Sequence, residues 1–125
     1  MARVTIKPIE PLEIEFTDGT IKEAIFNTQA FILFTEEFGS LDQVMEEELK
    51  NKPYEFASKL LYCGLKIFDR TVTLDEAKSI AIAGGEPLLV EIVRLMIDNF
   101  MVSADEDSKK KFLARVEQYN KEYQA

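Results

Sequence analysis

Apolar and charged side chains alternate near the start of the chain, over the five residues Leu12, Glu13, Ile14, Glu15 and Phe16. A period of two is typical of a strand with one buried and one solvated face. The pair Asp18-Gly19 follows and suits a tight turn. The pattern predicts a β-hairpin over about residues 4–26. Along its return strand, apolar residues fall on both sides, so the pattern leaves the facing of that strand open.

From residue 28 onward the apolar spacing becomes helical. The boundary signals are capping residues, prolines and glycines, namely Thr28, Gly39, Ser40, Pro53, Thr73, the pair Gly84-Gly85, Pro87 and Ser108. They predict helices over about residues 28–38, 40–49, 53–68, 74–83, 87–102 and 108–123. The predicted fold class is α+β and mostly α-helical, with an N-terminal β-hairpin followed by a compact bundle of five or six helices. We expect one domain over residues 1–102 and a charged C-terminal helix or tail over 103–125.

Charge is distributed unevenly along this chain of 125 residues, whose net charge is −8. Residues 36–48 carry six carboxylates and no basic residue. Such a surface repels phosphate groups, so we expect no nucleic-acid partner. The acidic run is interpreted either as a solvated face that aids solubility or as a surface that binds a basic protein. No apolar run reaches membrane-spanning length and no signal peptide is visible, which favours a cytoplasmic protein without a membrane partner.

The sequence offers few residues for catalysis or metal binding. It contains no histidine, and its single cysteine, Cys63, lies in an apolar helical segment where burial is the expected role. The acidic residues occupy adjacent helical positions that do not converge on one centre. Residues 103–107 (SADED) lack the glycine and the closing glutamate of a calcium loop, and no phosphate-binding glycine motif is present. We expect no enzymatic activity, no metal and no cofactor.

The predicted helix at 87–102 is apolar around most of its circumference. Its polar residues can form one narrow stripe and are Glu91, Arg94, Asp98 and Asn99. A helix of this kind is either central in the core or shared with a partner. Both interpretations remain open, because a small domain has difficulty burying such a helix completely.

Three short motifs follow one another in the middle of the chain. They read FGSLDQV (38–44), LLYCGLKIFD (60–69) and TVTLDEA (71–77). In this order, after a hairpin with an Asp-Gly turn and before an apolar helix, they resemble the tail assembly chaperones of long-tailed phages and prophages. Related proteins of gene transfer agents are similar as well. The resemblance covers roughly residues 12–102, and the chain looks like the short form of that family.

The resemblance implies a non-enzymatic protein that binds the long, apolar, helical tape measure protein and keeps it soluble. Such a protein also helps to recruit tail tube subunits and self-associates as a homo-oligomer. It acts in the cytoplasm of the bacterial host and is absent from the mature virion. The motif residues are expected to determine the fold, with Gly64 permitting close helix contact and with core positions at Leu41, Leu65, Leu74 and Ala77.

The partner surface is predicted on the outward part of the helix at 87–102. The six residues assigned to it are Leu89, Val93, Met96, Ile97, Phe100 and Met101. An apolar surface of this kind suits an apolar helical partner. The alternative function is a small acidic regulator, or nucleic-acid mimic, that uses residues 36–48 to bind a basic protein surface.

Overall fold

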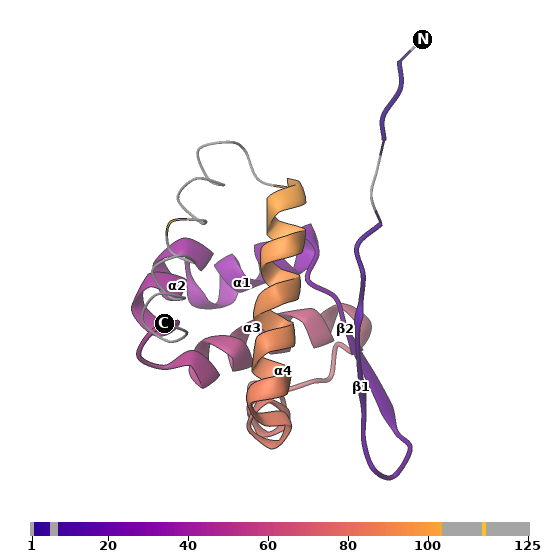
Figure 1. Cartoon of the computed structure of the whole chain (residues 1–125), viewed down its shortest axis with the longest axis vertical. Coiled ribbons are helices and arrows are strands. Elements are labelled where there is room, and N and C mark those ends of the chain that lie inside the picture. Colours follow the sequence, from indigo (N-terminus) through magenta and orange to yellow (C-terminus); the bar gives the residue numbers. More distant parts are fainter. Residues whose placement is uncertain (1, 6–7, 104–113, 115–125) are drawn as a thin grey trace.

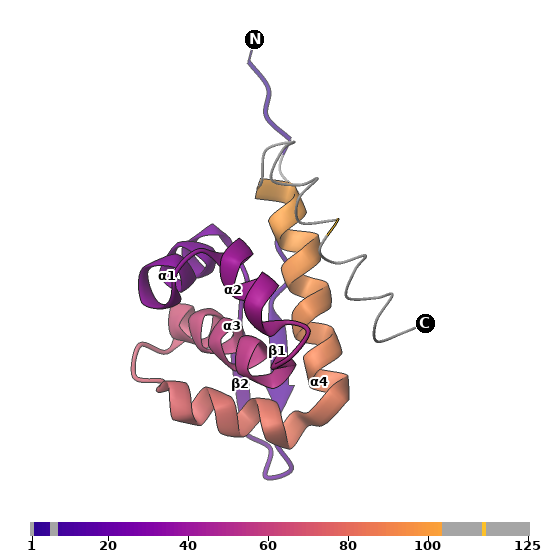
Figure 2. The same cartoon turned by 90° about the vertical axis from the view of Figure 1, so that its left-hand side faces the viewer.

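The computed structural model describes residues 2–5, 8–103 and 114. An antiparallel hairpin of β1 (Leu12–Glu15) and β2 (Ile21–Ala24) precedes the helices α1 (Thr28–Phe38), α2 (Leu41–Glu48), α3 (Pro53–Phe68) and α4 (Leu74–Ser103). Helix α3 is central, because it contacts β2 and each of the other three helices. Figures 1 and 2 show α1 and α2 packed together, the hairpin apart from them, and α4 as a long bent helix. The mostly helical fold with an N-terminal hairpin is as predicted.

The helix count differs from the prediction of five or six, since the described residues form four helices. The segments predicted at 74–83 and 87–102 are joined in α4, which bends at Gly85 (φ 64°, ψ −157°). Glycine adopts this left-handed φ without the steric cost that a Cβ would add. Gly84-Gly85 therefore bends the helix where the sequence predicted that it would end. The predicted helix at 108–123 lies outside the described residues except for one position.

The hairpin is shorter than the predicted span of 4–26. Its register pairs Leu12 with Ala24 and Ile14 with Lys22, and the described residues before position 12 form no strand. Pro8 and Pro11 lie in that leading segment, and proline cannot donate a ladder hydrogen bond. The alternation at 12–16 is confirmed, since its apolar side chains are half-buried and its glutamates exposed.

Packing against α3 determines which side of the return strand β2 is buried. Ala24 and Phe26 are fully buried against it, whereas Ile21 on the other side of the strand is 52% exposed. The backbone N–H of Ile25 donates to the carbonyl oxygen of Gly64 at 3.2 Å. A Cβ at Gly64 would lie 2.7 Å from Cε1 of Phe26, so the bare glycine permits this close contact. The predicted close approach at Gly64 thus joins a strand to a helix.

The core is built from large side chains on all four described helices and on the segment after β2. The largest buried ones are Phe26, Phe34, Phe56, Met45, Leu60, Leu61, Leu65, Ile92 and Met96. Phe34 packs edge to face on Phe38 and Phe56, with ring centroids 5.3 and 6.0 Å apart. Of the predicted core positions in the motifs, Leu41, Leu65 and Ala77 are buried. Leu74 is 36% exposed because it is the first residue of α4, so that assignment is wrong.

Helix starts agree only partly with the predicted caps. The N-terminal cap of α1 is Asn27, whose Oδ1 accepts from the N–H of Ala30 at 2.9 Å, one residue before the predicted Thr28. Thr73 caps α4 as predicted by accepting from the N–H of Glu76 at 3.1 Å. The side chain of Ser40 makes no capping hydrogen bond to α2. Pro53 occupies the first turn of α3, as predicted.

Candidate partner-binding surface

The structure places Cys63 in the interior of α3. The side chain is fully buried, and this burial raises the pKa of the thiol to about 12. A thiol in this state is mostly protonated at neutral pH and is a poor nucleophile or ligand. The described residues also hold no cluster of three or more histidine, cysteine, aspartate or glutamate side chains placed to bind a metal ion.

Cys63 is expected to resist thiol reagents in the folded protein. Modification by DTNB at about pH 8 should be at least about a hundredfold slower than in denaturant, because reaction requires both opening of the fold and ionisation of the thiol. The release of thionitrobenzoate measures both rates. Rapid modification of the native protein would show that the thiol is accessible.

The predicted partner residues on α4 lie mostly in or against the core. Met96 is fully buried and Leu89 is 8% exposed, while Val93, Ile97 and Phe100 are half-buried and pack against the core. The ring of Phe100 meets that of Phe31 edge to face at 5.8 Å. Met101 is placed on the helix backbone, but its side chain lies outside the described part of the chain. Met96 and Leu89 therefore do not form an outward surface, and a binding role for the half-buried residues stays a prediction.

The solvent side of the second half of α4 is polar. Arg94 pairs with Glu91 at 2.9 Å and with Asp98 at 3.3 Å, and all three side chains are about half exposed. Val90 beside them is 48% exposed, whereas Asn99 is only 6% exposed. The predicted polar stripe is thus confirmed for three residues, and Asn99 faces the interior.

A hollow of about 570 Å³, here called the hairpin groove, lies between the hairpin and the bend of α4. Its apolar lining comes from both sides, with Ile14 and Phe16 from the hairpin and Ile80, Ala83 and Leu88 from α4. The bend creates part of this wall. A Cβ at Gly84 would lie 2.6 Å from Cβ of Leu88, so the bare glycine lets Leu88 fold back over it.

Charged residues surround the apolar part of the hairpin groove. Glu15, Asp18 and Lys22 line its hairpin side. Hydrogen bonds from the backbone N–H and the side chain of Thr20 hold the pKa of Asp18 below its ordinary value, so this carboxylate is ionised at neutral pH. The ammonium of Lys22 lies 3.5 Å from the carboxylate of Glu76 and links the hairpin to the start of α4. The groove combines an apolar interior with a charged rim.

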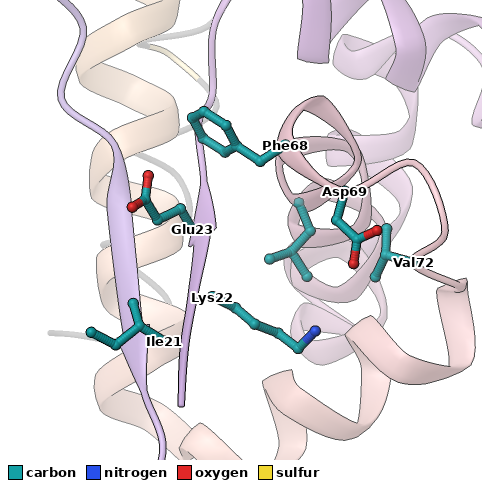
Figure 3. Close-up of a pocket in the computed structure, with 7 residues that line it drawn as sticks. Ile21, Lys22, Glu23, Phe68, Asp69 and Val72 are labelled. Carbon is teal, nitrogen blue, oxygen red and sulfur yellow. The ribbon is translucent and has the colours of Figure 1, made fainter. Parts of the chain in front are cut away.

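A second hollow of about 390 Å³, here called the edge groove, lies between β2 and the end of α3 (Figure 3). It is lined by Ile21, Lys22, Glu23, Leu65, Phe68, Asp69 and Val72. Phe68 is 54% exposed, which leaves a large ring open at this hollow. Hydrogen bonds from the hydroxyl and the backbone N–H of Thr71 lower the pKa of Asp69, so the carboxylate remains charged. In Figure 3, Lys22 reaches across the hollow, whereas Ile21 and Glu23 project from the other side of β2.

The acidic run at 36–48 is divided by the fold. Glu36, Glu37 and Glu47 are exposed on α1 and α2. Glu48 is only 15% exposed and forms an ion pair with Lys59 of α3. The same ammonium lies 5.7 Å from the ring centroid of Phe38. The end of the run therefore attaches α2 to α3, and only the earlier glutamates remain as an acidic surface.

Comparisons of the chain with protein-family models, with curated proteins and with solved structures found no match. None of the helices in the described ranges is long and apolar enough to cross a bilayer.

Proposed function

We propose that the protein is a non-enzymatic tail assembly chaperone that binds an apolar helical segment of a tape measure protein in the hairpin groove. The observation that carries this proposal is an open apolar hollow formed by Ile14, Phe16, Ile80, Ala83 and Leu88. An amphipathic helix binds such a surface by placing its apolar side chains inside, with polar contacts at the rim. The groove replaces the second half of α4 as the primary partner surface.

The surroundings of the hairpin groove fit a chaperone that must stay soluble while holding an apolar chain. Glu15 and Asp18 stand at the rim, and the net charge of the whole chain is −8. Repulsion between like-charged complexes opposes aggregation of the bound apolar chain. In this proposal the protein acts in the host cytoplasm, supports assembly of tail tube subunits, and is absent from the mature virion.

Ala83→Glu is the variant expected to abolish this binding. Ala83 is exposed and lines the groove, so a glutamate there should leave the fold intact while placing a charge among the apolar contacts. Retention of a co-expressed apolar tape measure fragment in the soluble fraction should fall by about tenfold or more, which corresponds to at least ~1.4 kcal/mol. The control is Ile32→Glu, at a residue of α1 that is 53% exposed and lines neither groove.

Equal retention of the tape measure fragment by both variants, with unchanged thermal midpoints, would exclude the hairpin groove as the binding site.

The same assay separates the chaperone from the alternative of an acidic regulator, which is favoured by the exposed Glu36, Glu37 and Glu47. Binding through charge weakens at high salt, whereas binding through apolar contact is maintained or strengthened. Retention that disappears at high salt would favour the acidic regulator.

A further inference from the structure

The strand β2 has a free edge. The N–H of Phe16 donates to the carbonyl oxygen of Thr20 at 2.8 Å, so these residues form a hydrogen-bonded pair. Bonded and non-bonded pairs alternate in an antiparallel ladder, so the N–H and C=O groups of Ile21, Glu23 and Ile25 point away from β1. The hydrogen bond from Ile25 to Gly64 of α3 agrees with this assignment.

In the part of the chain that the structure describes, α3 hydrogen-bonds to this edge at Ile25. Among the described residues, no backbone hydrogen bond reaches the edge at Ile21 or Glu23. The edge groove lies beside these two residues, and Leu65 and Phe68 of α3 line its opposite wall. An unpaired strand edge next to an apolar hollow is a site at which another extended chain can add as a strand.

Two carboxylates, Glu23 and Asp69, and one ammonium, Lys22, line the edge groove, so the balance of charge favours a basic strand. Glu13 lies directly opposite Glu23 on the outer face of the hairpin, and such like-charged pairs are destabilising. Asp69 adds a further carboxylate on the α3 side of the groove. A basic residue on an added strand would relieve the repulsion at Glu23.

The N-terminal segment of the chain has the matching pattern. Arg3, Val4 and Thr5 alternate between polar and apolar, and Ile6-Lys7 continues the alternation in the sequence. The side chain of Val4 is 81% exposed, so it is available to pack against another surface. Figures 1 and 2 show the described part of this segment extending away from the body of the protein.

We propose that the N-terminal segment of a second copy of this chain adds as a strand to the free edge of β2. Val4 enters the edge groove beside Leu65 and Phe68, and Arg3 lies on the outer face beside Glu23. The segment pairs with another copy, because within one chain it leads into β1, which lies on the opposite side of β2. This interaction goes beyond the proposed function, and the edge groove shares only Lys22 with the lining of the hairpin groove.

Disulfide trapping between two differently tagged variants tests the contact. In a Cys63→Ala background, one variant carries Val4→Cys and the other carries Phe68→Cys. Mixing the two under mild oxidation is expected to yield a heterodisulfide between copies. The matched control replaces Phe68→Cys with Ile32→Cys, because Ile32 and Phe68 are similarly exposed at 53% and 54%. Equal cross-linking with both partners, or none with Phe68→Cys, would overturn the proposal.

Two further measurements complete the test. A double variant with Val4→Cys and Phe68→Cys should form covalent dimers or larger species, and a purely intramolecular disulfide would show that the segment binds its own chain.

In sedimentation, Arg3→Glu and Glu23→Arg should each weaken self-association by about tenfold or more, and mixing the two should restore it. Unchanged self-association in both would contradict the charge pairing. Ala83→Glu should leave self-association unchanged, which separates this proposal from the proposed function.

Discussion

Gly64→Val is expected to lower the free energy of unfolding by about 3 kcal/mol or more. A Cβ at this position would lie 2.7 Å from Cε1 and 3.1 Å from Cδ1 of Phe26, and 3.2 Å from Cβ of Ala24. Phe26 is fully buried, so its ring has no free space into which it can move. The added side chain would also push β2 away from α3 and strain the hydrogen bond from Ile25 to Gly64. Urea unfolding followed by far-UV circular dichroism measures the loss.

A double-mutant cycle shows whether the contact with Phe26 is the cause. Gly64→Ala adds one methyl group and improves helix propensity by up to about 1 kcal/mol, so any net destabilisation reports the clash. Phe26→Leu makes room at the same point. If the clash dominates, the two changes together should cost less than the sum of their separate costs. Strict additivity would locate the effect elsewhere.

Met96→Ala is expected to destabilise the protein by about 2–5 kcal/mol, because it leaves a cavity in the core. The side chain of Met96 is fully buried. The sequence pattern does not show this, because the helix is apolar on nearly all sides. The control on the same helix is Val90→Ala, at a position that is 48% exposed and where the change should stay within about 0.5 kcal/mol. Equal effects of the two variants on the urea midpoint would contradict the assignment of Met96 to the core.

The burial of Met96 also affects how variants of the partner surface predicted on α4 must be interpreted. Loss of partner binding in a Met96 variant would reflect loss of the fold, since the side chain does not reach solvent. Changes at Ala83, which is exposed and lines the hairpin groove, report on binding without that complication. The distinction could not be drawn from the helix alone, because its apolar residues have the same local pattern in either role.

In the hairpin, the local sequence pattern predicts the facing of the first strand but not that of the second. The alternation at 12–16 predicted one buried face because each charged side chain is separated from the next by an apolar one. The return strand has apolar residues on both sides, and its facing depends on the contact of Phe26 with Gly64 of α3. These two residues are far apart in the chain, so no local pattern relates them.

The two grooves could not be predicted from the sequence, because each is formed by residues from separate parts of the chain. The hairpin groove joins Ile14 and Phe16 to Ile80, Ala83 and Leu88, which are separated by more than half of the chain. The pair Gly84-Gly85 was visible as a break, yet whether it ended a helix or bent one depended on the packing around it. The edge groove likewise depends on where the end of α3 meets β2.

Residue types and short-range spacing were enough to give the order of the elements, most helix boundaries and the position of Cys63 in an apolar segment. The absence of histidine is likewise a property of the amino-acid sequence. The packing of the elements is needed to show which apolar side chains are covered, since it buries Met96 and leaves Ile21 and Phe68 exposed. Burial depends on elements brought together from distant parts of the chain, whereas periodicity reflects only the conformation of each element.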